Sequence, residues 1–319
     1  MNYFFLPLLP FLFPIPLHAW SSLGHSTIAA IAEHQLSSSA RSQITAVLSQ
    51  GRDPDLPAIA NWADDVRAAA AGRGPLSEDP EARDFNDQFP TNALWHFVNL
   101  PLGIENYRLS SASHSPNNVV HAIQHCIAVL ETVDNHRADF TKLQALRLLV
   151  HFVGDIHQPL HCGTGFYDLS DPSHPVLLTD PRRCGDKPND RGGNDLWYGS
   201  EPNQELHALW DDALVYAINQ SPDYELLARR LETTLVHSIG STSGDYHNWP
   251  EQWAVDSAHV AQNAYRSLTL ESASLEGQRL RISIRLAPDY LEVNQRIVAE
   301  QLAKGGVHLA QLLNVIKWR

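Results

Sequence analysis

Two segments of the sequence place a histidine four residues before an aspartate within an apolar run. LRLLVHFVGDIHQPLHC contains His151 and Asp155, and LHALWDDAL contains His207 and Asp211. On a helix this spacing puts both side chains on one face, where a buried polar pair is unfavourable unless it is hydrogen-bonded or coordinates something. Imidazole and carboxylate are zinc ligands. The repetition favours a metal site over the competing interpretation, two hydrogen-bonded core pairs.

His161 follows the first pair directly, just beyond the point where Pro159 ends its helix. Three more polar residues are weaker candidates for the same site: Asp64 in ANWADDVR, His96 in LWHFVNLP, and, weaker still, His25. Taken singly, a histidine between aromatic residues is more often a satisfied core residue than a ligand.

The composition excludes one way of binding nucleic acid. The chain has 36 acidic and 23 basic residues and a net charge of −13, whereas a basic binding surface works by replacing the counterions of the polymer with lysine and arginine. A polyanionic substrate would need another source of positive charge. The 17 histidines, against one methionine and three cysteines, point to bound metal ions as that source.

The first 19 residues, MNYFFLPLLPFLFPIPLHA, are expected to be a cleavable secretory signal. They contain no Asp, Glu, Lys or Arg and end in Leu17-His18-Ala19. The mature chain would begin at Trp20 and form a single domain over residues 20–319. The alternative is an uncleaved membrane anchor, which the prolines and the short length of the segment disfavour. No later segment is apolar enough to span a bilayer.

Most of the remaining chain shows apolar residues at three- and four-residue spacing, which predicts an all-α fold of roughly eight helices with at most a short β-hairpin. The expected helices cover residues 21–37, 55–70, 118–135, 140–158, 203–219, 224–237, 250–268 and 289–316. Loops are expected at 71–92 and 162–193, which are rich in Pro, Gly, Asp and Ser. Only 279–286, RLRISIRL, alternates like a strand.

Together these motifs resemble a known family, the trinuclear-zinc, single-strand-specific nucleases that also act as 3′-nucleotidases. The resemblance runs from WSSLGH at residue 20 through WADDVR, LWHFVNLP, HFVGDIHQPLH, GGND and LHALWDD to QLAKGGVHLAQLLN. It therefore covers nearly the whole mature chain.

The resemblance implies three Zn²⁺ ions per chain, held by nine residues. The matching residues are Asp64, His96, His151 and Asp155 for one ion, His161, His207 and Asp211 for a second, and Trp20, His25 and the bridging Asp155 for the third. Trp20 would contribute its free α-amine and carbonyl, and an α-amine with a pKa of about 8 can release its proton to a metal. The same ligands would also accept manganese or iron.

The implied activity is that of a secreted or periplasmic endonuclease. It would hydrolyse phosphodiester bonds of single-stranded DNA and RNA to 5′-phosphate products and would also act on 3′-nucleotides. A metal-activated hydroxide would attack phosphorus in line, with Asp155 bridging two ions and Asp64 orienting the hydroxide. We expect no stable protein partner and no membrane attachment after signal cleavage, and we expect a monomer.

Four residues match positions that contact substrate in this family. Arg67, where relatives often have lysine, would grip a phosphate oxygen. Phe97 would stack on a base, and Asn194 would hydrogen-bond to it. Asn99 stands where fungal relatives have aspartate in the base pocket, so base preference stays open. The competing interpretations are a surface salt bridge for Arg67 and a core position for Phe97.

Cys162 and Cys184 lie in the expected loop 162–193 that follows His161, here called the excursion. A disulfide between them would close this loop. Cys126 is left over and is expected to be a buried thiol.

Two other functions fit part of the sequence. A zinc phospholipase C resembles this architecture, but those enzymes have a longer gap after the N-terminal Trp and a Glu where this chain has Asp211. A non-enzymatic zinc-binding module would need neither a shared carboxylate nor stacking aromatic residues. Release of soluble nucleotides from a polymer separates the three possibilities.

Overall fold

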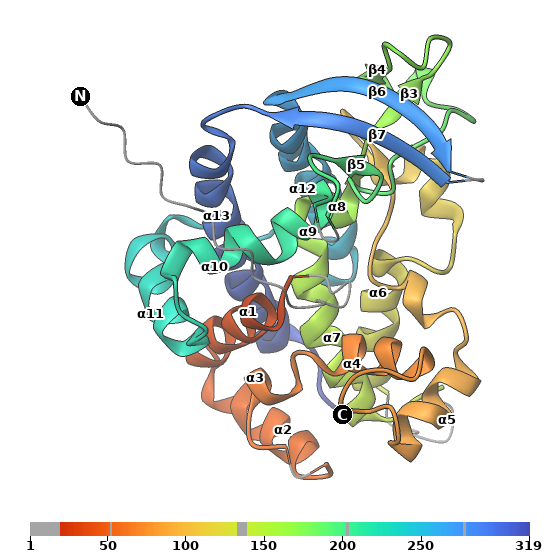
Figure 1. Ribbon diagram of the computed structural model, residues 1–319. Coiled ribbons are helices and arrows are strands. Elements are labelled where there is room, and N and C mark those ends of the chain that lie inside the picture. Colours follow the sequence, from red (N-terminus) through yellow and green to blue (C-terminus); the bar gives the residue numbers. More distant parts are fainter. Residues whose placement is uncertain (1–19, 52, 133–138, 202–203, 277–278) are drawn as a thin grey trace.

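The computed structural model describes residues 20–51, 53–132, 139–201, 204–276 and 279–319, and over these residues the chain is mainly helical, as predicted (Figure 1). The expected signal peptide, residues 1–19, lies outside the described residues. None of the described helices is long and apolar enough to cross a membrane.

The longer helices pack around one shared core. They are α1 (Ser22–His34), α2 (Ser38–Leu48), α4 (Trp62–Ala70), α5 (Pro80–Gln88), α6 (Val119–Leu130), α7 (Lys142–Ile156), α11 (Tyr224–Thr234), α12 (Trp249–Arg266) and α13 (Tyr290–Val315). Helix α7 runs through the middle and contacts α1, α4, α6, α12 and α13. The shorter helices are α3 (Leu56–Ile59), α8 (Pro159–Cys162), α9 (Leu206–Ala208) and α10 (Leu214–Asn219).

Helix α7 is fixed at both ends by its sequence. Thr141 and Gln144 form a reciprocal capping box at its start, which satisfies two backbone N–H groups that would otherwise lack partners. Its residues from Ala145 to Ile156 are all buried, including Arg147, which pairs with Asp53 and Glu81 outside the helix. Proline cannot continue a helix but suits its first turn. The chain therefore leaves α7 after Ile156 and begins α8 at Pro159.

Three small sheets tie the loops to this helical body. A hairpin of β6 (Leu268–Glu276) and β7 (Arg279–Leu286) pairs with β5 (Leu196–Trp197), and β7 lies in the middle. In a second sheet, β1 (Leu100–Pro101) runs parallel to β2 (Gly163–Thr164), which joins the segment after His96 to the segment after His161. The third is a short pair within the excursion, β3 (Phe166–Asp168) and β4 (Val176–Leu178).

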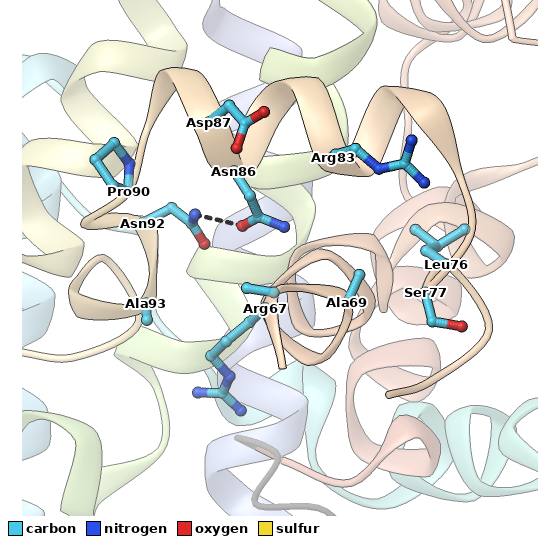
Figure 2. A pocket seen from close by; sticks show the side chains of 11 residues that line it. Arg67, Ala69, Leu76, Ser77, Arg83, Asn86, Asp87, Pro90, Asn92 and Ala93 are labelled. Atoms are coloured by element: carbon cyan, nitrogen blue, oxygen red, sulfur yellow. Dashed lines mark hydrogen bonds between the residues drawn. The ribbon is translucent and has the colours of Figure 1, made fainter. Parts of the chain in front are cut away.

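Several element boundaries differ from the sequence prediction. The expected helix 55–70 is divided into α3 and α4, and the helix at 203–219 contains a π-helical turn at Leu209–Ala213. The expected loop 71–92 contains α5, which has Asp79 as its cap but buries only Ala82 and Phe85, so its apolar pattern is faint. Asn92 after this helix donates to Asn86 on it at 2.8 Å (Figure 2).

The predicted Cys162–Cys184 disulfide is wrong, because all three cysteines are free thiols. Cys162 Sγ donates to the Ile156 carbonyl oxygen at 3.3 Å, and Cys184 Sγ donates to that of Asp180 at 3.6 Å. The excursion is held instead by β3, β4 and the hydrogen bonds of a buried carboxylate described below. Cys126 is a buried thiol, as expected.

Candidate metal centre

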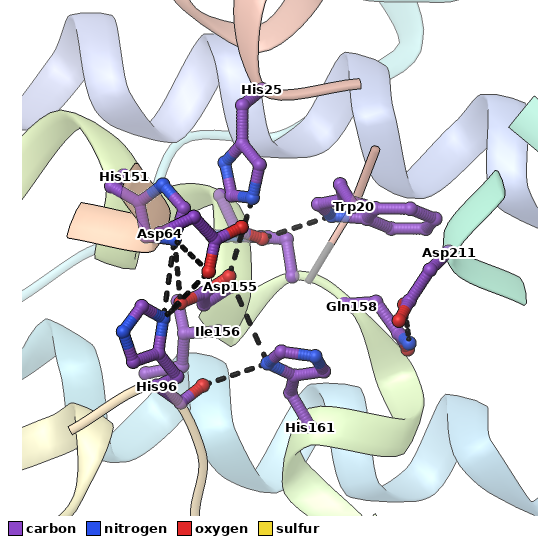
Figure 3. A network of polar contacts seen from close by, with 12 residues as sticks. Trp20, His25, Asp64, His96, His151, Asp155, Ile156, Gln158, His161 and Asp211 are labelled. Atoms are coloured by element: carbon purple, nitrogen blue, oxygen red, sulfur yellow. Dashed lines mark hydrogen bonds and ion pairs between the residues drawn. The ribbon is translucent and has the colours of Figure 1, made fainter. Parts of the chain in front are cut away.

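The histidines and aspartates singled out in the sequence converge on one buried site in the middle of the helical body (Figure 3). They come from six separate segments: α1, α4, the stretch before β1, α7, α8 and the helix that begins with α9. All of these side chains are buried. They form three groups whose ligand atoms lie within 4.8 Å of one another: His25, His151 and Asp155; Asp64, His96 and His151; and His161, His207 and Asp211.

Asp155 lies between the groups. Its Oδ2 is 3.0 Å from His96 Nδ1 and 3.3 Å from His151 Nε2, while its Oδ1 is 3.4 Å from His25 Nε2. The same Oδ1 is 3.7 Å from His161 Nδ1. A carboxylate with each oxygen facing a different set of imidazoles is suited to bridging two cations.

The His161 and His207 rings face each other through their Nε2 atoms, an arrangement that fits a cation bound between them. Each donates its Nδ1 hydrogen to a backbone carbonyl oxygen, of His96 at 2.7 Å and of Gly192 at 2.6 Å. Each neutral ring therefore presents an unprotonated Nε2, and these two nitrogens are 3.2 Å apart. Two lone pairs at this distance repel each other unless a metal ion binds both, and the carbonyl bonds hold the rings in the tautomer that a metal requires.

His25 is another buried group in the site whose polar atoms have no hydrogen-bond partner. Neither ring nitrogen of His25 has a hydrogen-bond partner among the described residues, and neither does Asp155 Oδ1. The His25 ring stacks on that of His151 with centroids 3.9 Å apart. Buried polar atoms are rarely left unpaired, so this side of the site also fits a bound cation.

Burial keeps most of these imidazoles in the neutral, ligating form. It holds the pKa of His25 well below its ordinary value and lowers the pKa of His96 to about 4 and that of His207 to about 3. His151 differs, because Asp155 and Asp64 outweigh its burial and raise its pKa to about 9. Burial also raises the pKa of Asp211 well above its ordinary value. Divalent cations bound here would offset that accumulation of buried carboxylates.

The S1/P1 nuclease family model matches residues 20–317. The chain belongs to the S1/P1 nuclease family. This membership supports hydrolysis of nucleic acid as the chemistry of the site.

The chain is similar to characterised members of the S1/P1 family along almost its entire length. It is 27% identical to nuclease S1 of Aspergillus oryzae over 94% of this chain and 92% of that protein. It is 26% identical to nuclease P1 of Penicillium citrinum, over 93% and 97% of the two chains. Endonuclease 4 of Arabidopsis thaliana is 25% identical over 93% of this chain and 89% of its own length.

Trp20, the residue expected to begin the mature chain, is fully buried next to the three His/Asp groups. Its indole Nε1 donates to the Gly154 carbonyl oxygen at 3.0 Å, and the following residue, Ser21, donates its backbone N–H to the Asp211 carbonyl oxygen at 2.7 Å. These bonds tie the segment to α7 and to the π-helical turn, both of which carry predicted ligands.

The expected substrate contacts lie on segments next to these ligands. Arg67, one turn after Asp64 on α4, places Nη2 2.8 Å from Asp64 Oδ1. Phe97, next to His96, is half-buried and lies outside the hydrophobic core of the described residues, which argues against a core position. Asn99 is also half-buried. Asn194 is in the GGND loop, and its Nδ2 donates to the Arg191 carbonyl oxygen at 2.8 Å.

Two buried residues that support the candidate site were not singled out in the sequence. Gln158 is fully buried, and its Nε2 donates to Asp211 Oδ1 at 2.6 Å. Asp190 is also fully buried and accepts hydrogen bonds from the Tyr167 and Thr164 hydroxyls at 2.6 and 2.9 Å. A glutamine inside DIHQPLHC and an aspartate just before GGND are the only signals that could have pointed to them.

Proposed function

We propose that this chain is a zinc-dependent endonuclease that hydrolyses single-stranded DNA and RNA to 5′-phosphate products and also acts on 3′-nucleotides. The observation that carries the proposal is the set of three adjoining His/Asp groups, two of which share His151. The Asp155 carboxylate lies within 3.7 Å of an imidazole nitrogen from each of the three groups. Family membership and the nuclease relatives support the same reaction class.

Zinc is the proposed metal because all eight side chains in the three groups are imidazoles or carboxylates. The ions, when bound, supply Lewis acidity and the positive charge that this chain of net charge −13 lacks for a phosphate substrate. Trp20 completes the proposed set through its α-amine once the preceding residues are removed. Secretion would then precede full metal loading, because an amide nitrogen inside an uncleaved chain cannot replace an amine.

Asp64 and Arg67 have separate roles in the proposed hydrolysis. In the proposed reaction, the water oxygen bonds to phosphorus in line while the P–O3′ bond breaks and O3′ takes up the proton that the water loses. One product therefore carries a 5′-phosphate and the other a 3′-hydroxyl. Asp64 accepts a hydrogen bond from the attacking oxygen and orients it. Arg67, whose side chain is 24% exposed next to Asp64, binds a non-bridging phosphate oxygen through its guanidinium.

Recognition of the polymer is assigned to Phe97, Asn99 and Asn194. The half-buried Phe97 ring offers a face for base stacking, which tolerates any base. Asn99 and Asn194 offer amide donors and acceptors to base edges. A preference for unpaired strands follows, because a base within a duplex cannot stack on a protein side chain.

The first experiment measures zinc content by mass spectrometry on the secreted protein, together with hydrolysis of single-stranded DNA and RNA before and after chelation. We expect about three zinc ions per chain, with activity lost on chelation and restored by zinc. Loaded protein that cleaves neither polymer would contradict the proposal, and cleavage of a phosphatidylcholine substrate instead would favour a phospholipase C.

A paired variant tests the ligand assignment. His207→Ala removes one ligand from the His161–His207–Asp211 group and is expected to lower the zinc content by about one ion per chain. His259→Ala is the control, because His259 is an exposed histidine on α12. Equal zinc content in both variants would remove His207 from the metal centre.

A further inference from the structure

A pocket of about 370 Å³ opens beside the metal centre, between α4, α5 and the segment after α5 (Figure 2). It is lined by Arg67, Ala69, Ala70, Leu76, Ser77, Arg83, Asn86, Asp87, Pro90, Asn92 and Ala93. None of the nine proposed metal ligands is among these residues. The pocket is therefore a separate cavity that adjoins the proposed reaction site.

Arg67 connects the pocket to the metal centre. It lines the pocket, and its Nη2 lies 2.8 Å from Asp64 Oδ1 in the metal centre. Figure 2 shows the Arg67 guanidinium directed away from Asn86 and Arg83, so a phosphate bound by it would lie beside the pocket, and the next unit of a polymer could enter the pocket.

The charges of the pocket suit a phosphodiester chain. Its lining contains two guanidinium groups, Arg67 and Arg83, and one carboxylate, Asp87. Figure 2 shows Arg83 extending from α5 toward Leu76 and Ser77, at the opposite side of the pocket from the Arg67 guanidinium. Arg83 is exposed, and no acidic side chain among the described residues pairs with it. An unpaired arginine in a strongly acidic protein is available to bind an anion.

The remaining lining suits the base and sugar of a nucleotide. Ala69, Ala70, Leu76 and Pro90 supply apolar surface. The amide of Asn92 is held in place, since its Nδ2 donates to both Asn86 Oδ1 and the Phe89 carbonyl oxygen, at 2.8 and 2.7 Å. This leaves Asn92 Oδ1 as a fixed acceptor for an N–H donor on a base.

We propose that this pocket is a subsite for a second nucleotide of the single-stranded substrate, adjacent to the one whose phosphate is cleaved, and that Arg83 binds its phosphate. The inference rests on the proposed nuclease function. It predicts that oligonucleotides long enough to reach Arg83 gain affinity that short substrates do not.

The test compares kcat/KM of zinc-loaded wild type and Arg83→Ala on a 3′-mononucleotide and on an oligothymidylate of about eight nucleotides. We expect Arg83→Ala to lower kcat/KM on the oligomer about fivefold to tenfold and to leave the mononucleotide within about twofold. Because one phosphate contact is lost, the salt dependence of oligomer cleavage should also weaken, by about 0.7 in the slope of log kcat/KM against log salt concentration.

Two further variants separate charge from packing. Arg83→Lys keeps the positive charge and is expected to retain most of the activity on the oligomer. Arg229→Ala removes an arginine from a different helix, α11, and should leave kcat/KM on both substrates unchanged. Equal loss on both substrates, or no loss on the oligomer, would overturn the subsite while leaving the nuclease function intact. A wild-type protein that cleaves neither substrate would overturn both.

Discussion

His207 Nδ1 donates a 2.6 Å hydrogen bond to the backbone carbonyl oxygen of Gly192. The GGND loop thus does more than present Asn194, because it also sets the tautomer and direction of a proposed metal ligand. Such supporting bonds typically affect metal affinity about tenfold to hundredfold.

The loop is in turn held by the buried carboxylate of Asp190. This carboxylate accepts the backbone N–H of Gly193 at 3.0 Å, and the Thr164 hydroxyl that donates to it accepts the N–H of Gly192 at 2.9 Å. The loop that aims His207 is therefore fixed to the chain immediately after α8.

Gly192→Ala is expected to disturb this arrangement. Gly192 has φ +64°, and an added Cβ would lie 2.0 Å from the Leu160 carbonyl oxygen, so the loop must move and carry the acceptor away from His207. We expect zinc affinity at that group to fall about tenfold to hundredfold, measured by competition with a chelator. Gly185→Ala is the matched control, since Gly185 also has positive φ but an added Cβ meets nothing within 4 Å. Equal affinities in the two variants would refute the coupling.

Substitutions of Arg67 test its proposed contact with phosphate. Arg67→Ala should lower kcat/KM on single-stranded DNA by about a hundredfold, and Arg67→Lys by about tenfold, because lysine keeps the charge but not the bidentate geometry. Zinc content should stay at the wild-type level in both. If activity is unchanged in Arg67→Ala, Arg67 is only a salt-bridge partner of Asp64.

Removal of the metals should destabilise the fold. Without cations, His161 and His207 are left with facing lone pairs, and the carboxylates of the centre stay buried. An ion present at about 100 times its Kd stabilises the folded state by about 2.7 kcal/mol. We therefore expect chelation to lower Tm by at least about 5 °C and zinc to restore it, as measured by scanning calorimetry. An unchanged Tm would mean that the ions do not bind in this core.

His247 gives a pH-dependent contribution at the opposite end of α12 from the hairpin. Hydrogen bonds to Glu131 at 3.0 Å and Asp245 at 2.8 Å raise the pKa of His247 above 6.5. A raised pKa stabilises the fold fully below the unfolded value, and this contribution disappears as pH rises through the folded value. His247→Gln should therefore lower Tm by about 1 °C at pH 5.5 and have no effect at pH 9, while His259→Gln should have none at either pH.

Four of the proposed ligands, His151, Asp155, His207 and Asp211, could be singled out from the sequence because their spacing is local, whereas the rest of the proposed set came from the family resemblance. A His-x3-Asp pair on an apolar helix shows its chemistry within five residues, and burial against neighbours only strengthens the signal. The strand at 279–286 could also be predicted from the sequence, because its residues alternate between buried and less buried positions.

Other features depend on contacts that no local pattern encodes. Helix α5 buries too few apolar residues to show a helical period. The roles of Gln158 and Asp190 arise from partners far along the chain, such as Asp211 for Gln158. The disulfide was predicted wrongly because cysteine spacing says nothing of where each sulfur points, and here each finds a different carbonyl oxygen.

The facing Nε2 atoms of His161 and His207 also bear on how such a chain can change over generations. Replacing either ring with a hydrocarbon side chain of similar size would remove the repulsion and stabilise the metal-free fold, at the loss of the site. Mutations that improve folding are therefore expected to be incompatible with activity at these positions. Selection for activity at the proposed centre would therefore keep the metal-free protein below the stability that its own architecture could reach.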